Sequence, residues 1–255
     1  MGEPEMQVRI YDRQVEVVGR PVTYRVAGSG EPVVLVHGLA GSMRWWARTV
    51  PALASRHTVY LVDLPGFGSM RRAPGGFVLK ESASWLVAWM RALDLGQAHL
   101  VGHSMGGYIC LQVAIEEPEA ARCLVLVDPA WWPHGRSMFG PLWPLVQECL
   151  LPPNKLLPML VHDALRAGPL TLWRAARDLL AQDALDDLRS ARSSTLLVWG
   201  EDDALVPASI GLVLRREIPR SRLLLIKGAR HVPMIDRPDI FNQALLSFLA
   251  GQPVG

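Results

Sequence analysis

The chain is poor in cysteine, and it lacks any long run of like-charged or apolar residues. Its three cysteines, Cys110, Cys123 and Cys149, are an odd number, so we expect reduced, mostly buried thiols rather than a disulfide set or a metal site. Lys and Arg form runs no longer than two residues and the formal net charge is only +2, which argues against a nucleic-acid partner. No apolar run has the length that a bilayer span requires, which argues against stable membrane insertion.

Other absences exclude further classes of protein. Residues 1–10 mix Glu3, Glu5 and Arg9 with few apolar side chains, unlike a signal peptide, so we expect a soluble, cytoplasmic protein. The sequence contains no phosphate-binding P-loop, no dinucleotide-binding loop and no metal-ligand cluster, so we expect no cofactor and no metal. What remains is a chain of 255 residues, half of them apolar and a fifth charged, which is typical of a soluble globular protein.

Short apolar runs alternate with segments of helical spacing along most of the chain. Strands separated repeatedly by helices predict an α/β protein with a mostly parallel sheet of eight strands and helices on both faces. We expect two strands within residues 8–26 and further strands at 32–36, 58–62, 99–101, 123–127, 195–199 and 222–226, with helices at 43–54, 81–93, 105–116, 207–218 and 235–249.

The alternation breaks between residues 131 and 190. This stretch shows no clear strand and is rich in proline, which favours short helices inserted into the fold over a continuation of the sheet. We therefore expect a core domain formed by residues 1–130 and 191–255, and a helical cap formed by residues 131–190.

The stretch Leu100–Gly107 reads as the end of an apolar strand, one sharp turn and the start of a helix. Gly102 and Gly106 flank Ser104 in a G-x-S-x-G pattern, in which the tight reversal needs positions without a Cβ atom. The helix that follows directs its first amides, and the positive end of its dipole, towards the serine. Such a turn favours the build-up of negative charge, and hence attack on a carbonyl group.

A serine nucleophile needs a base, and the base needs an acid to orient it. In open parallel sheets, sites form beyond the carboxyl ends of the strands, and His231 follows the last predicted strand. His37 is a second plausible base, although its loop more often supplies backbone amides, and His103 is expected to face away from Ser104. Asp203 is the preferred acid because it follows a buried strand, and Asp128 stays a rival after the preceding strand.

Five segments together resemble the α/β-hydrolase fold family, over nearly the whole chain except the cap. They are the loops 37–42, 63–69, 102–107, 199–207 and 228–233, and the elbow has the form G-H-S-M-G-G of esterases and monoacylglycerol-lipase-like members. The resemblance implies Ser104 as nucleophile, His231 as general acid and base, and Asp203 as its orienting carboxylate. It also implies an oxyanion hole formed by the backbone N–H groups of Leu39 and Met105.

The motifs are much more specific for the fold than for a substrate. An unusually apolar cap predicts a small-molecule ester substrate that is uncharged, apolar and of small to medium chain length, cleaved through an acyl-enzyme. Lactones, thioesters and carbon–carbon bonds are alternative substrates, and a ligand receptor without turnover is a further alternative. The residues expected to line the substrate site are His37, Gly38, His103, Trp131, Phe139, Trp143, Val206 and Val232.

Overall fold

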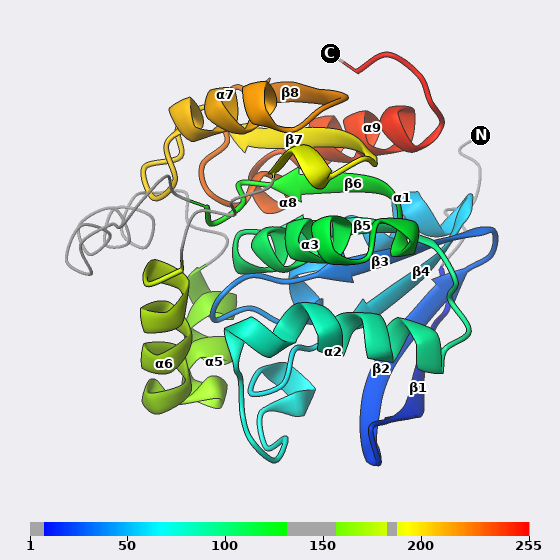
Figure 1. The fold of residues 1–255 in the computed structure, drawn as a ribbon, viewed down its shortest axis with the longest axis vertical. Coiled ribbons are helices and arrows are strands. Elements are labelled where there is room, and N and C mark those ends of the chain that lie inside the picture. Colours follow the sequence, from blue (N-terminus) through cyan, green and yellow to red (C-terminus); the bar gives the residue numbers. More distant parts are fainter. Residues whose placement is uncertain (1–7, 132–156, 183–187, 255) are drawn as a thin grey trace, which may run out of the picture.

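The structure, a computed structural model, describes residues 8–131, 157–182 and 188–254. Within these residues eight strands form one sheet in the order β1-β2-β4-β3-β5-β6-β7-β8 (Figure 1). β1 and β2 form an antiparallel hairpin, β2 runs antiparallel to β4, and the remaining pairs are parallel. The strands are β1 Ile10–Val17, β2 Arg20–Gly28, β3 Glu31–Val36, β4 His57–Val62, β5 Ala98–His103, β6 Ala121–Val127, β7 Ser194–Gly200 and β8 Ser221–Ile226.

Helices cover both faces of the sheet, so the predicted α/β architecture with a mostly parallel sheet is confirmed. One face packs against α2 Leu79–Ala92, α3 Met105–Glu116 and α7 Ala208–Glu217. The other face packs against α1 Val50–Ala54, α8 Pro233–Asp236 and α9 Pro238–Leu249 (Figure 1). The described residues also form four short 3-10 helices: η1 Met43–Trp46, η2 Gly68–Met70, η3 Pro118–Ala120 and η4 Leu188–Ser190.

The continuous apolar runs of the sequence are explained by burial on both faces. In β3, Val34 and Val36 belong to the core on one side of the sheet, and Val33 and Leu35 belong to the core on the other side. Successive side chains of a strand point to opposite faces, so a strand covered by helices on both sides has no solvent-facing position for a polar residue.

Two of the predicted helices are each divided in the structure. The helix predicted at 43–54 is the 3-10 turn η1 followed by α1, which begins with Pro51 in its first turn. The helix predicted at 235–249 is α8 followed by α9, and Arg237 between them has an extended φ of −133°. Pro238 disfavours helical conformation in the residue before it, which is the physical reason for the second division.

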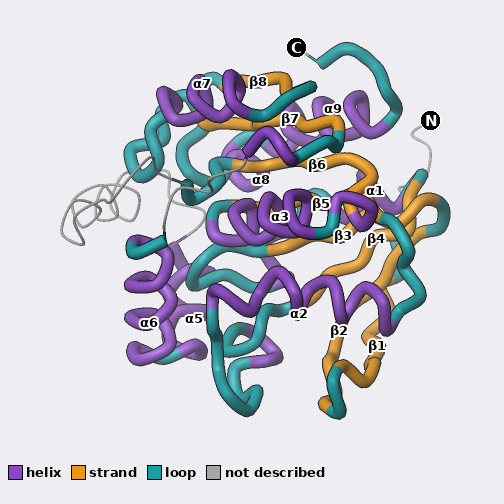
Figure 2. The backbone as a smooth tube through the Cα atoms, viewed as in Figure 1, coloured by secondary structure: helices purple, strands orange, loops and turns teal. Residues whose placement is uncertain are grey.

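Two helices lie within the segment predicted to form the cap, α5 Leu157–Ala167 and α6 Pro169–Leu180. They stand side by side at one end of the sheet, where α5 contacts η2 and α6 contacts α2 (Figures 1 and 2). Gly168, with φ of +79°, makes the turn between them. The division of the chain into a core and a cap at residues 131 and 190 stays a prediction.

Two of the three cysteines lie in the described part of the chain. Cys110 is buried, Cys123 is partly buried, and both are free thiols. Cys149 lies outside the described residues. In the same described part, no helix combines the length and the apolar composition needed to cross a membrane.

Candidate active site

Ser104 occupies a strained turn between the last residue of β5 and the first residue of α3. Its backbone has φ of +51° and ψ of −116°, a conformation that non-glycine residues rarely adopt. A Cβ atom on Gly102 would lie 2.3 Å from the carbonyl oxygen of Gly106, and one on Gly106 would lie 2.4 Å from that of Val36. Both glycines of the G-x-S-x-G pattern are therefore required by contact with backbone, and the turn holds the serine hydroxyl at the end of the sheet.

The structure brings Ser104, His231 and Asp203 into one chain of hydrogen bonds. The Nε2 atom of His231 lies 3.0 Å from Ser104 Oγ, and its Nδ1 atom lies 2.8 Å from Asp203 Oδ2. All three side chains are buried, although their loops follow three different strands. Because an ionised carboxylate only accepts hydrogen bonds, the imidazole carries its proton on Nδ1 and leaves Nε2 free to accept from the serine hydroxyl.

Asp203 is suited to orienting the imidazole because it stays ionised. Burial by itself raises the pKa of Asp203, but the positive charge and hydrogen bond of His231, with bonds from Val206 and Asp128, lower that pKa overall. Its Oδ1 atom accepts hydrogen bonds from the backbone amides of Leu205 and Val206, at 2.8 and 2.9 Å. The other carboxylate oxygen is thereby directed at His231.

Asp128, the alternative acid, lies close to Asp203 and His231. It follows β6, is fully buried, and accepts a hydrogen bond from the amide of Gly200 at 3.0 Å. A side-chain hydrogen bond with Asp128 also contributes to lowering the pKa of Asp203. Ligand atoms of Asp128, Asp203 and His231 lie within 4.8 Å of one another, and these mutual bonds account for that grouping. Asp203 is the acid that contacts the imidazole.

The loop predicted to supply the oxyanion hole lies against the serine. A Cβ atom on Gly38 would lie 3.0 Å from Ser104 Cβ, so the backbone of this loop passes directly beside the nucleophile. Leu39 follows Gly38, Ala40 is held at φ of +56°, and the Gly41 amide donates to the Gly38 carbonyl at 3.0 Å. Met105 opens α3 on the other side of Ser104. The two predicted amide donors are thus each one residue away in sequence from a residue of this contact, Gly38 or Ser104, and the oxyanion hole they would form stays a prediction.

His37 is enclosed by protein rather than exposed in a pocket. Its Nε2 atom accepts a hydrogen bond from the Leu64 amide at 3.0 Å, and its Nδ1 atom donates to the Gly38 carbonyl at 2.8 Å. Burial lowers the pKa of His37, against the opposing charge of Asp63, so the ring stays neutral. Its contacts support the loop beside the serine, and its predicted place at the substrate site stays a prediction.

His103 is also enclosed. Its Nε2 atom lies 2.8 Å from the backbone carbonyl oxygen of His231, and its ring lies between the rings of Trp45 and His231, at 5.7 and 5.0 Å. Burial, followed by the charge of His231, lowers the pKa of His103 to about 3. The neutral ring contacts the base through the backbone carbonyl of His231, and its predicted place at the substrate site stays a prediction.

The remaining residues predicted to line the substrate site divide into two groups. Trp131, Val206 and Val232 are buried and pack within the two cores. Phe139 and Trp143 lie outside the described residues. Whether any of these side chains contacts substrate stays a prediction.

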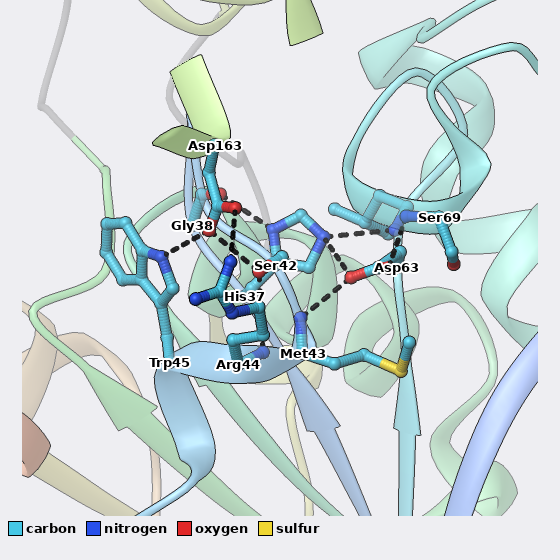
Figure 3. A network of polar contacts seen from close by, with 10 residues as sticks. His37, Gly38, Ser42, Met43, Arg44, Trp45, Asp63, Ser69 and Asp163 are labelled. Atoms are coloured by element: carbon cyan, nitrogen blue, oxygen red, sulfur yellow. Dashed lines mark hydrogen bonds and ion pairs between the residues drawn. The ribbon is translucent and has the colours of Figure 1, made fainter. Parts of the chain in front are cut away.

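One further group of polar side chains joins α5 to the loop beside Ser104, and sequence patterns indicate it only weakly. Asp163 of α5 is buried against Ser42 and Trp45, while Asp63 accepts hydrogen bonds from the amides of Met43 and Ser69 (Figure 3). The available signal was the position of Asp163 on the buried face of α5, four residues before buried Ala167. A lone acidic residue on such a face needs a partner, and the partner could be found only from the structure.

The chain is similar to known hydrolases and esterases. The "Putative carbamate hydrolase RutD" of Caulobacter vibrioides is 32% identical over 260 residues, covering 92% of this chain and 94% of the relative. The "Pimeloyl-(acyl-carrier protein) methyl ester esterase" of Aeromonas hydrophila is 30% identical over 249 residues, covering 87% and 96%. A thermophilic esterase of Thermogutta terrifontis superimposes with a TM-score of 0.82 at 24% identity, covering 94% and 98%.

A match to the family described as "alpha/beta hydrolase fold" spans residues 31–184, from β3 through the helices α5 and α6. This span contains the elbow at Ser104 and the loop at Gly38, whose contacts are described above. The resemblance that the sequence motifs carried is thereby confirmed, and this chain belongs to the alpha/beta hydrolase fold family.

Proposed function

We propose that this hydrolase is a serine carboxylic-ester hydrolase that acts on small to medium-chain apolar esters. The observation that carries the proposal is the continuous hydrogen-bond chain from Ser104 through His231 to Asp203, with a base on one side of the hydroxyl. The loop at Gly38 and the start of α3 on its other side supply the backbone amides that an acyl-transfer reaction needs.

Acylation begins when Ser104 Oγ attacks the ester carbonyl carbon and its proton moves to Nε2 of His231. The carbonyl oxygen becomes an oxyanion, which the amides of Leu39 and Met105 stabilise; one such donor is typically worth about 3–4 kcal/mol. The imidazolium, stabilised by ionised Asp203, then donates its proton to the alcohol oxygen as the carbon–oxygen bond breaks. The products of this step are the alcohol and an acyl-serine.

Deacylation repeats the same steps with water. His231 takes a proton from the water molecule as its oxygen attacks the acyl carbon, and the tetrahedral intermediate forms again at the same amides. Collapse of this intermediate breaks the bond to Ser104 Oγ, and the imidazolium returns the proton to that oxygen. The carboxylic acid leaves, and the enzyme is restored without a cofactor.

The residues beside the nucleophile support an uncharged substrate. Leu39 and Met105 are apolar. His37 and His103, which lie close by, have lowered pKa values and stay neutral. The apolar composition of residues 131–160 supports an acyl or alcohol pocket of moderate size.

The test is hydrolysis of p-nitrophenyl esters from acetate to palmitate, with the variant Ser104→Ala measured alongside. We expect turnover with an optimum at a middle chain length, and a loss of at least about 10⁴-fold in the variant. Ser84→Ala is the matched control, because Ser84 lies on the exposed side of α2 and its hydroxyl donates to the Glu81 carbonyl of the same helix. Turnover that persists in Ser104→Ala would exclude the mechanism.

A carbamate is the second candidate substrate class, supported by the name of the relative that is 32% identical over 92% of this chain. Attack by Ser104 on a carbamate carbonyl uses the same base and amides, and forms a carbamoyl-serine instead of an acyl-serine. Faster turnover of p-nitrophenyl carbamates than of any ester would favour this class over the proposed one.

Lactones, thioesters and carbon–carbon substrates form one further group of alternatives, and a receptor without turnover forms another. A fluorophosphonate probe separates them, since it reacts with an activated serine whatever its natural substrate. Labelling of Ser104 without ester turnover would indicate a different substrate of the same mechanism. A folded protein that is not labelled would favour a receptor.

A further inference from the structure

Asp163 is a buried carboxylate in a helix whose other charged side chain, Arg166, is exposed. Only 2% of its side chain is accessible, and it shares the buried face of α5 with Ala167. A carboxylate is strongly disfavoured away from water unless hydrogen-bond donors surround it. The donors around Asp163 therefore indicate which segment of the chain α5 binds.

Among the residues that the structure describes, the hydrogen bonds and the ion pair of Asp163 lie in one short segment, Ser42–Trp45. Its Oδ2 atom accepts a hydrogen bond from Ser42 Oγ at 2.7 Å and another from Trp45 Nε1 at 3.0 Å (Figure 3). The Nη1 atom of Arg44 is 4.0 Å from Oδ1, and its side chain is half exposed, so the two neutral donors are the close contacts. Ser42 and Trp45 are themselves buried, and without Asp163 both donors would lose their partner.

The same segment is held from its other side by the core. The amide of Met43 donates to Asp63 Oδ1 at 2.7 Å, and the amide of Gly41 donates to the Gly38 carbonyl at 3.0 Å. Residues 38–45, which we name the oxyanion loop, therefore lie between a carboxylate of the β4–η2 turn and a carboxylate of helix α5 (Figure 3).

The oxyanion loop is in contact with two parts of the hydrogen-bond chain at Ser104. Gly38 lies against Ser104, as the 3.0 Å approach of a Cβ atom to Ser104 Cβ shows. Trp45, which donates to Asp163, places its ring 5.7 Å from that of His103, and His103 bonds to the carbonyl of His231. A displacement of this loop therefore changes the position of the amide that faces the developing oxyanion.

We propose that Asp163 is a positioning residue, which holds the oxyanion loop in its working geometry and makes that geometry depend on the docking of α5. The inference rests on the proposed function, because it assigns to Ser42–Trp45 the task of placing the Leu39 amide for acyl transfer. Asp163 acts through Ser42 and Trp45 and contacts no reacting atom.

The first test compares Asp163→Ala with Asp163→Asn in steady-state hydrolysis of the best p-nitrophenyl ester. Alanine removes the acceptor, and we expect kcat to fall about 10- to 100-fold, with KM changed by less than about threefold. The asparagine side-chain oxygen can accept from both donors, so we expect Asp163→Asn to stay within about fivefold of the wild type. An asparagine variant as impaired as the alanine variant would contradict the hydrogen-bond mechanism.

A trifluoromethyl ketone separates a positioning role from a purely structural one. Ser104 adds to its carbonyl and places an oxyanion at the Leu39 and Met105 amides, so the affinity reports the oxyanion hole. We expect inhibitor affinity to fall in Asp163→Ala by about the same factor as kcat. Unchanged inhibitor affinity in a folded Asp163→Ala protein would overturn the proposal.

Asp178→Ala is the matched control, since Asp178 lies on the neighbouring helix α6 and pairs with adjacent Arg177 at 2.6 Å. We expect this variant to keep wild-type kcat and inhibitor affinity. Should Asp163→Ala fail to fold, Ser42→Ala removes one of the two donors with a smaller change. We then expect a fall in kcat of up to about tenfold with little change in KM, and wild-type kcat in Ser42→Ala would overturn the proposal.

The rate of labelling by a fluorophosphonate keeps this inference separate from the ester assignment. Ser104 Oγ displaces fluoride from phosphorus and its proton leaves through His231, in a reaction that also uses the oxyanion hole. A wild type that is labelled but hydrolyses no ester would end the ester assignment alone. Slower labelling of Asp163→Ala than of Asp178→Ala would still support the positioning role, and equal rates would overturn it.

Discussion

His103 donates a hydrogen bond from Nε2 to the backbone carbonyl oxygen of His231, 2.8 Å away. The residue immediately before the nucleophile thus holds the loop of the base, across 128 positions of sequence. Its ring also lies against Trp45, so one buried imidazole touches the oxyanion loop and the base together. His103 is therefore placed to keep the Ser104–His231 distance fixed.

Replacement of His103 tests this role. In His103→Ala the His231 carbonyl loses its donor and a cavity forms, so we expect kcat to fall about 10- to 100-fold. In His103→Gln the side-chain amide can donate to the same carbonyl, so we expect recovery of most of the activity. The measurement is kcat for the best ester, with circular dichroism as the check of folding. Equal activity of the alanine variant and the wild type would show that the bond does not position the base.

The buried histidines predict a loss of stability in acid. Burial lowers the pKa values of His37, His57, His99 and His103 in the folded state, and that of His103 falls to about 3. Below the ordinary value of 6.5 the unfolded chain binds protons that the folded chain does not, so the free energy of unfolding falls as pH falls. For the fully buried His103, the loss of unfolding free energy is at most about 1.4 kcal/mol per pH unit in this window.

Denaturant unfolding between pH 7 and pH 5 measures this effect. For His103 alone the expected loss at pH 5 is about 2 kcal/mol, because pH 5 lies well above its folded pKa. We expect His103→Gln to lose about that much less stability than the wild type over the same interval. Identical pH dependence of the two proteins would show that His103 is not buried in its neutral form.

Asp128 and Asp203, which follow β6 and β7, should respond very differently to replacement by asparagine. Asp128→Asn keeps a side-chain oxygen that accepts from the Gly200 amide, and it leaves the hydrogen bond between Asp203 and His231 in place. We expect this variant to stay within about threefold of wild-type kcat. Asp203→Asn removes the charge that stabilises the imidazolium, and we expect a loss of about 10²–10⁴-fold.

The comparison of the two asparagine variants decides which acid works with His231. Asp128→Leu serves as a third variant, because it removes both hydrogen bonds of the carboxyl and leaves the Gly200 amide without a partner. We expect this protein to lose about 1–3 kcal/mol of unfolding free energy as well as activity. If Asp128→Asn were the more damaging asparagine variant, Asp128 would be the orienting acid and the assignment of Asp203 would be wrong.

Much of the fold could be predicted from local sequence, because the buried strands and the elbow at Ser104 have strong local patterns. The run Pro32–Val36 indicates a strand covered on both faces, and the glycines around Ser104 indicate a sharp turn. The parts that were missed depend on contacts between distant residues. Asp163 and Ser42 are 121 positions apart, and no periodicity of α5 shows which donors its carboxylate meets.

The same limit applies to the histidines. From the sequence, His37 and His103 are predicted to line the substrate site. The structure places both rings among backbone partners, with the His37 ring between Leu64 and Gly38. The sequence indicates which loops carry these two histidines. The hydrogen-bond partners of each ring can be identified only from the structure.

Gly38 provides the last prediction, since it lies where the oxyanion loop approaches the nucleophile. A Cβ atom there would be 2.8 Å from His103 Nδ1 and 3.0 Å from Ser104 Cβ, so Gly38→Ala must displace the loop or the elbow. His103 and Ser104 are both buried and have little room to move, so we expect a loss of about 1–3 kcal/mol in unfolding free energy. We expect kcat to fall by about 10²-fold, because the Leu39 amide moves with the loop.

Gly96→Ala is the control for Gly38→Ala. A Cβ atom on Gly96 has open space around it, so this variant should keep wild-type kcat and gain up to about 1 kcal/mol from the reduced freedom of its unfolded chain. The two variants share one chemical change and differ only in what surrounds the added methyl group. If Gly38→Ala retained full activity, the loop beside Ser104 would not need its present position, and the Leu39 amide could not be the donor that stabilises the oxyanion.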